Sequence, residues 1–319
     1  MIFMILLVFP VQLAHLGGAF YPEIPDVAKF GLLHVYVDLP LWLYISLLIM
    51  VVAIQGIWFG RMMNRHQFFE SNTSWPMIAF YLLAITSSSQ LHHLNIVLFN
   101  FVFLYIYQRL FNLNEDELGD YQIHMDIGSV YAVGLLFFPE GIFMLPLILL
   151  AVNQFSVFDI NRFLLFLLSI LIFVVPAIVL LYLYGDRVSL IDELVVLLGQ
   201  GPSFQRLLEP GFLYTYIALI ASVVLVVPMV MNQLSFMQNQ NRKIVTVMII
   251  HLVMGLAAAV FASSDSTAVI LLTSVPVVFL FAFGVGHVQR RWLINVYMML
   301  LLFALLFIQW VYVFDGLEV

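Results

Sequence analysis

Long apolar runs separated by short polar stretches dominate the chain. A helix that crosses a membrane needs about 20 mostly apolar residues, and most of these runs reach that length. We predict single spanning helices over the following segments: Met1–Phe20, Pro40–Gly60, Phe163–Tyr184, Phe212–Phe236, Ile244–Ser264, Ser266–His287 and Trp292–Phe314. Met1–Phe20 lacks the basic start of a signal peptide, so we expect an uncleaved helix, although Gly17-Gly18-Ala19 leaves cleavage open.

Two polar interruptions predict helical hairpins. The stretch "ITSSSQLHHLN" (85–95) separates Trp75–Ser89 from His92–Asn112, and one helix through both would bury two histidines in hydrocarbon. The stretch "FFPEG" interrupts 127–157: its proline breaks a helix, its glutamate is charged and its glycine favours a turn. With these two hairpins the prediction is an all-α, polytopic membrane helix bundle of about eleven spans, forming a single domain over 1–319.

Lysine and arginine gather in alternate loops, which orients the bundle. The residues expected on the cytoplasmic side are Arg61, Arg65, Arg109, Arg162, Arg242, Lys243, Arg290 and Arg291; those expected outside are Lys29, Arg187 and Arg206. Short cytoplasmic loops are enriched in basic residues. We therefore expect a cytoplasmic N-terminus, a periplasmic C-terminus and both hairpin tips on the outer face. A single helix through 127–157 would instead place Arg162 on the opposite side from Arg109.

The composition agrees with lipid as the solvent. The 319-residue chain is 64% hydrophobic and 9% charged, with a mean hydropathy of +1.09, whereas soluble domains carry about 25% charged residues. The net charge of −7 argues against nucleic acid as a partner, because nucleic-acid-binding proteins present basic surfaces. The absence of cysteine excludes disulfides and thiolate chemistry.

Several polar residues are expected on the outer face. Asp38, Glu140 and Asp265 each adjoin a span or a hairpin tip, where partial desolvation would suit a carboxylate to proton transfer, so they are candidate catalytic residues. The alternative is that such carboxylates only solvate helix ends. The candidate substrate-binding residues are His92, His93, Arg187 and Arg206.

Neither a metal site nor a cofactor is expected. The two adjacent histidines of the first hairpin would point about 100° apart on a helix and could not clamp one ion. A third histidine, His251, lies within a predicted span, and the commoner outcome for such a residue is a neutral ring bonded across helices. The segment "RVSLIDELVVLLG" predicts an amphipathic helix near 186–199 on the outer leaflet.

Several stretches carry a resemblance to a known family. These are "NIVLFNFVFLYIYQRLFNL", "DIGSVYAVGLLFFPEGIFMLPLILLAV", "FLLFLLSILIFVVPAIVLLYLYGD", "NRKIVTVMII" and "SVPVVFLFAFGVGHVQRRWL". They resemble an uncharacterised multi-pass inner-membrane protein family of Bacteroidota. The resemblance implies a bacterial inner membrane and a role in the cell envelope, but no activity.

The layout of the spans and outer loops has a weaker, fold-level likeness to GT-C type glycosyltransferases, which use polyprenyl-phosphate-linked sugars. That likeness implies a catalytic acid in the first outer loop, for which Glu23, Asp26 and Asp38 are the candidates. The chain departs from this class because the usual adjacent acidic pair is missing and because 319 residues is short.

Two functions remain open, and the sequence does not decide whether the protein is an enzyme. The first is a non-catalytic subunit or scaffold of an envelope assembly, favoured because no short catalytic motif occurs. The second is an enzyme or flippase for lipid-linked sugars, in which Asp38 acts as a general base and Arg187 or Arg206 holds the lipid phosphate. The expected partners are the lipid bilayer together with other envelope proteins or a polyprenyl-phosphate lipid.

Overall fold

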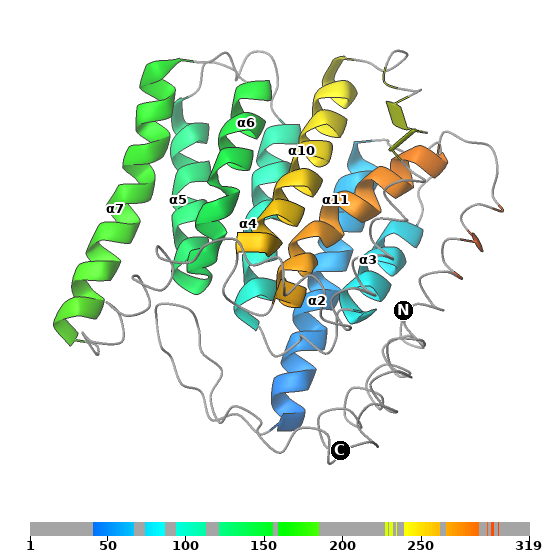
Figure 1. Cartoon of the computed structure of the whole chain (residues 1–319), viewed down its shortest axis with the longest axis horizontal. Coiled ribbons are helices and arrows are strands. Elements are labelled where there is room, and N and C mark those ends of the chain that lie inside the picture. The colour runs from blue at the N-terminus through cyan, green and yellow to red at the C-terminus, as the bar shows by residue number, and fades with distance from the viewer. Residues whose placement is uncertain are drawn as a thin grey trace.

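A computed structural model describes most of the middle of the chain. It covers residues 41–66, 74–86, 94–112, 121–155, 159–184, 239–261 and 266–286, with isolated positions between 227 and 299. In these ranges all regular structure is helical (Figure 1). The elements are α2 (Leu41–Arg65), α3 (Trp75–Thr86), α4 (Leu94–Phe111), α5 (Tyr121–Phe137), the 3-10 helix η4 (Pro139–Met144), α6 (Leu145–Phe155), α7 (Ile160–Tyr184), α10 (Asn239–Phe261) and α11 (Ser266–Gly286).

The helices occur where the apolar runs predicted them, but three extend further into polar sequence. α7 begins at Ile160 rather than Phe163. α2 continues past Gly60 to Arg65, and α10 begins at Asn239 rather than Ile244. Hydropathy marks only the apolar part of a helix, whereas backbone hydrogen bonding continues through the polar turns at its end. The predicted spans Met1–Phe20, Phe212–Phe236 and Trp292–Phe314 and the amphipathic helix near 186–199 lie outside the described ranges.

The predicted break after Phe138 is confirmed. The chain leaves α5, forms η4 over Pro139–Met144 and returns as α6. The hydroxyl of Tyr131 donates to the carbonyl of Gly141 (2.6 Å), and the amide of Gly141 donates to the carbonyl of Phe138 (3.0 Å). These bonds satisfy backbone groups that the proline leaves outside the α-helical pattern.

α2, α3 and α4 also alternate in direction. Gly60 near the end of α2 packs against Met77 near the start of α3, and Gly56 one turn earlier faces Phe80 further along α3. α3 therefore runs antiparallel to α2, and α4 packs against α2 (Figure 1). This agrees with the predicted first hairpin, whose tip at 87–93 lies outside the described residues.

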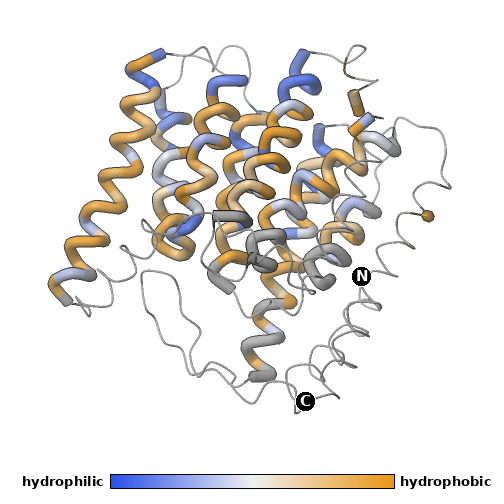
Figure 2. Tube along the Cα trace, viewed as in Figure 1, coloured by the Kyte–Doolittle hydropathy of each residue, from blue (hydrophilic) through white to orange (hydrophobic). Residues whose placement is uncertain are grey.

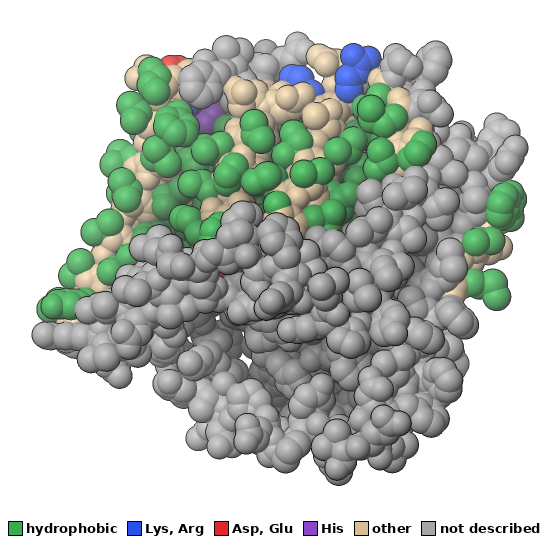
Figure 3. Space-filling model, in the orientation of Figure 1, with side chains coloured by type: hydrophobic (Ala, Val, Ile, Leu, Met, Phe, Trp, Pro, Cys, Tyr) green, Lys and Arg blue, Asp and Glu red, His purple; other side chains and the backbone are tan. Residues whose placement is uncertain are grey.

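One end of the bundle collects all the described lysines and arginines, and we call it the basic end. The residues are Arg61, Arg65, Arg109, Arg162, Arg242 and Lys243. Contacts between helix termini bring them together: Arg109 pairs with Asp126 at the start of α5 (2.6 Å), and the Arg162 guanidinium lies 5.8 Å from the ring centre of Tyr121. The polar helix ends lie along the upper edge of Figures 2 and 3. The placement of these residues on one side, predicted from the sequence, is confirmed within the described part.

α4 lies at the centre of the bundle and carries a column of rings. Phe99, Phe103, Tyr107 and Phe111 follow one another at four-residue spacing, which places them on one helix face. Neighbouring ring centres are 5.2, 6.2 and 5.6 Å apart along this column. All four side chains are fully buried, so they form the core against which the other helices pack.

Among the described helices, two are long and apolar enough to cross a membrane, namely Ile160–Leu180 in α7 and Asn239–Ala258 in α10. They differ in their surroundings, because 17% of the α7 segment is buried against 44% of the α10 segment. α7 lies at the edge of the bundle against α5 (Figure 1). A total of about eleven spans stays a prediction.

α5 and α7 approach closely at a glycine. A β-carbon added at Gly128 would overlap the Ser169 hydroxyl and lie 2.7 Å from the backbone carbonyl oxygen of Phe166. The hydroxyl could rotate, but the backbone oxygen cannot move without α7. Small residues at such positions are the usual means by which membrane helices pack tightly.

We predict that Gly128→Ala destabilises the protein and that Gly56→Ala does not. Overpacking against the backbone of α7 should cost about 1–3 kcal/mol, while a β-carbon at Gly56 meets its nearest atom at 3.4 Å. The measurement is the thermal midpoint of the monodisperse protein in detergent. Equal midpoints for the two variants would contradict the close α5–α7 contact.

Candidate functional site

The structure describes one of the seven sequence-predicted site residues. Glu140 lies in η4, whereas Asp38, Asp265, His92, His93, Arg187 and Arg206 lie outside the described ranges. The grouping of these residues into one outer-face site is therefore not tested by the described geometry.

Glu140 is a buried carboxylate at the end of the bundle opposite the basic end. Its exposed fraction is 7%. The next residue, Gly141, is pressed against the Phe99 ring, and a β-carbon on Gly255 of α10 would lie 3.9 Å from the Met144 methyl. These contacts hold η4 between α4 and α10. No described lysine or arginine lies at this end. The cost of burying the Glu140 carboxylate is therefore not offset by a described lysine or arginine.

His251 forms a fully buried polar contact between helices. Its Nδ1 lies 2.5 Å from the Tyr107 hydroxyl, and its ring lies 4.6 Å from that of Phe103. Both partners are on α4, while the backbone of Leu272 in α11 lies beside the imidazole. The expectation that this histidine bonds across helices is confirmed.

A second buried contact joins α2 to α4. The side-chain amide of Gln55 donates to the carbonyl of Val97 at 2.5 Å. Gln55 is fully buried, and its partner lies in the first turn of α4. Like the His251–Tyr107 contact, this bond fixes one helix against another.

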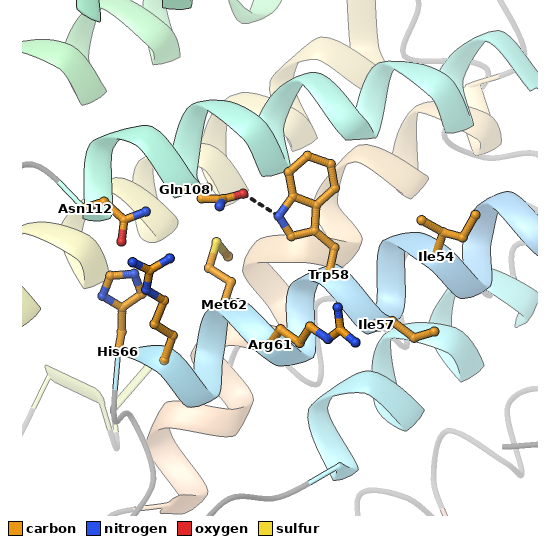
Figure 4. A pocket seen from close by; sticks show the side chains of 9 residues that line it. Ile54, Ile57, Trp58, Arg61, Met62, His66, Gln108 and Asn112 are labelled. Carbon is orange, nitrogen blue, oxygen red and sulfur yellow. Dashed lines mark hydrogen bonds between the residues drawn. The ribbon is translucent and has the colours of Figure 1, made fainter.

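A pocket of about 690 Å³ opens at the basic end between α2 and α4 (Figure 4). On the α2 side, the lining side chains change from apolar to cationic along the helix. The α4 side ends in the side-chain amides of Gln108 and Asn112. The lining residues are Ile54, Ile57, Trp58, Arg61, Met62, Arg65, His66, Gln108 and Asn112. None of them is acidic, so the pocket carries positive charge.

A hydrogen bond across the pocket fixes its polar wall. The indole N–H of Trp58 donates to Oε1 of Gln108 (2.6 Å), as drawn in Figure 4. An indole can only donate, so Gln108 must present its oxygen to Trp58 and retain its NH₂ group for another acceptor. Trp58 also packs against Phe101 with ring centres 5.9 Å apart. The pocket wall is therefore held in place by both helices.

His66 closes the polar end of the pocket as a neutral group. Burial, together with the charge of Arg65, lowers the pKa of its imidazole below the ordinary value of 6.5. The ring meets Phe111 edge-on at 5.7 Å. The positive charge of the pocket at pH 7 therefore comes from Arg61 and Arg65.

Sequence analysis missed this pocket. The signal that could have indicated it is on α2, where Ile54, Ile57, Arg61 and Arg65 share one face by their spacing. The contribution of α4 could not be read from the sequence, because it depends on which helix lies beside α2.

Comparison with protein-family models, with curated proteins and with solved structures finds no match for this chain.

We predict that the Tyr107 hydroxyl and the His251 imidazole are energetically coupled. A cycle of Tyr107→Phe, His251→Leu and the double variant should give a coupling energy of about 1 kcal/mol, within the range found for hydrogen bonds between membrane helices. The measurement is the free energy of unfolding in sodium dodecyl sulfate. Tyr105→Phe, on the same helix, should couple to His251→Leu by a negligible amount; additivity in the Tyr107 cycle as well would contradict the bond.

Proposed function

We propose that this chain is a multi-pass protein of a bacterial inner membrane and a non-catalytic subunit or scaffold of a cell-envelope assembly. In this proposal the N-terminus is cytoplasmic and the C-terminus periplasmic. Its partners are the lipid bilayer and other envelope proteins.

The membrane location is supported by the surface of α7. Large apolar side chains are exposed around much of this helix. Leu171, Ile172 and Phe173 are all exposed, although consecutive helical residues point about 100° apart. Figure 3 shows hydrophobic side chains along the edge of the molecule that α7 occupies in Figure 1. A monomeric soluble protein rarely exposes so large an apolar patch, whereas hydrocarbon solvates such a surface without cost.

The orientation is supported by the basic end. Six lysines and arginines lie there in the described part, and short cytoplasmic loops are enriched in these residues. The basic end would face the cytoplasm, and η4 with Glu140 would face the periplasm.

The non-catalytic role is supported by the partners of the buried polar side chains, which form hydrogen bonds within the bundle. The bonds from Tyr107 to His251, from Gln55 to Val97 and from Tyr131 to Gly141 each join one helical element to another. A polar group in hydrocarbon is costly unless it is paired, and pairing across helices holds the bundle together. Such a bundle presents rigid helix faces to partner proteins.

A second candidate function is an enzyme or flippase that handles polyprenyl-phosphate-linked sugars at the periplasmic face. The observation that favours it is the position of Glu140, a buried carboxylate at the end of the bundle opposite the basic end, because carboxylates act as general acids or bases. Asp38 or Asp265 would have to lie near it, with His92 or His93 and with Arg187 or Arg206 holding the lipid phosphate. GT-C type transferases remain the fold-level likeness for this candidate.

We predict that the Asp38→Asn and Glu140→Gln variants each restore normal detergent resistance to a strain from which the gene for this protein has been deleted. The scaffold needs the shape of these side chains and not their charge, so detergent sensitivity should return to the wild-type level. Asp126→Asn at the basic end is a control with the same chemical change.

The protein level is measured by immunoblot in each strain. An enzyme that used either carboxylate as acid or base would lose about 10²- to 10⁴-fold in rate. Loss of complementation at an unchanged protein level, with Asp126→Asn still active, would therefore contradict the scaffold and favour the enzyme.

A further inference from the structure

One face of α2 changes from apolar to cationic along its length. Leu43, Met50 and Ile54 are exposed at 36%, 54% and 46%, and exposed Arg61 and Arg65 follow on the same face. A helix rises about 1.5 Å per residue, so Met50 and Arg61 are about 16 Å apart along the axis. This is about half of the roughly 30 Å hydrocarbon core of a bilayer. The axial separation of Arg61 and Met50 thus matches the depth of one leaflet.

The two cations of this pocket, Arg61 and Arg65, differ from Arg109 and Arg162 at the basic end in their acidic partners. Arg109 pairs with Asp126 and Arg162 lies near Asp159 (3.9 Å), whereas within the described ranges Arg61 has no acidic partner and neither has Arg65. Figure 4 shows Arg61 extending along α2 toward Ile57, while Gln108 and Asn112 lie on the α4 side of the pocket, beside Trp58 and His66. The pocket therefore offers two cations and amide donors to an anion.

We propose that the pocket between α2 and α4 binds one anionic phospholipid. Arg61 and Arg65 pair with the headgroup phosphate by charge-assisted hydrogen bonds, and the NH₂ group of Gln108 supplies a neutral donor. An acyl chain lies along Ile57, Ile54 and Met50. Basic pockets between helices on the cytoplasmic side of a membrane suit such headgroups. This inference rests on the membrane location proposed above.

The apolar half of the pocket distinguishes a lipid from a soluble phosphate. A phosphate ion or a sugar phosphate would use only the cationic end and would leave Ile54 and Ile57 in contact with water. The same residues continue the exposed apolar face of α2, so the pocket opens sideways to the hydrocarbon. Trp58 lies between the two halves, at the depth where tryptophan is enriched in membrane proteins.

The test is lipid binding by the full chain in neutral detergent, measured by native mass spectrometry during titration with phosphatidylglycerol or phosphatidylcholine. We expect one tightly held phosphatidylglycerol and no comparable phosphatidylcholine. Arg61→Gln/Arg65→Gln should weaken phosphatidylglycerol binding about thirtyfold, the change that two cations at about 1 kcal/mol each imply. Arg61→Lys/Arg65→Lys, which keeps both charges, should retain most of the binding.

The matched control is Arg242→Gln/Lys243→Gln, which removes two charges from the same end outside the pocket. Equal loss in this control, or wild-type binding by Arg61→Gln/Arg65→Gln, would overturn the site. Displacement of the lipid by millimolar glycerol phosphate would identify a soluble phosphate as the occupant and overturn the lipid. Liposome flotation separates the two proposals: a chain that does not float contradicts the membrane location, whereas one that floats without selective binding contradicts only this site.

Discussion

The exposed apolar surface of α7 is the constraint on which the proposed membrane location depends. Most of this helix is exposed and nearly all of its exposed side chains are apolar. In hydrocarbon, each backbone N–H and C=O must be paired within the protein, and a helix achieves this within its own segment. The same condition accounts for wholly helical structure in the described ranges and for polar residues collected at the helix ends.

Inside the bundle, the central position of α4 concentrates the contacts that fix helix against helix. Its ring column supplies apolar packing. Its first turn provides the partner of Gln55, and its C-terminal part provides the partners of Trp58 and His251. The hydrophobic effect does not drive helices together in lipid, so close packing and such bonds must do so. The contact of α5 with α7 at Gly128 is close packing of this kind.

The sequence predicted those features that follow from local chemistry. A proline followed by a charged residue and a glycine cannot continue a helix, so the break at Pro139 could be located, and the alternation of basic loops placed Arg109 and Arg162 on one side. The partner of His251 and the pocket beside Trp58 could not be predicted, because both require knowing that α4 lies against α10 and α2. Helix ends were misplaced at Arg65 and Asn239, where polar turns extend an apolar span.

The central claim is a membrane-embedded bundle whose basic end faces the cytoplasm, and the absence of native cysteine allows a direct test. Ser88→Cys, in the tip of the first predicted hairpin, and Asn239→Cys, at the start of α10, each create the sole thiol of the chain. We measure labelling of spheroplasts by a membrane-impermeant maleimide. The account predicts that the thiol at 88 reacts in intact spheroplasts and that the thiol at 239 reacts only after lysis. Labelling of the thiol at 239 in intact spheroplasts, with the thiol at 88 protected, would contradict it.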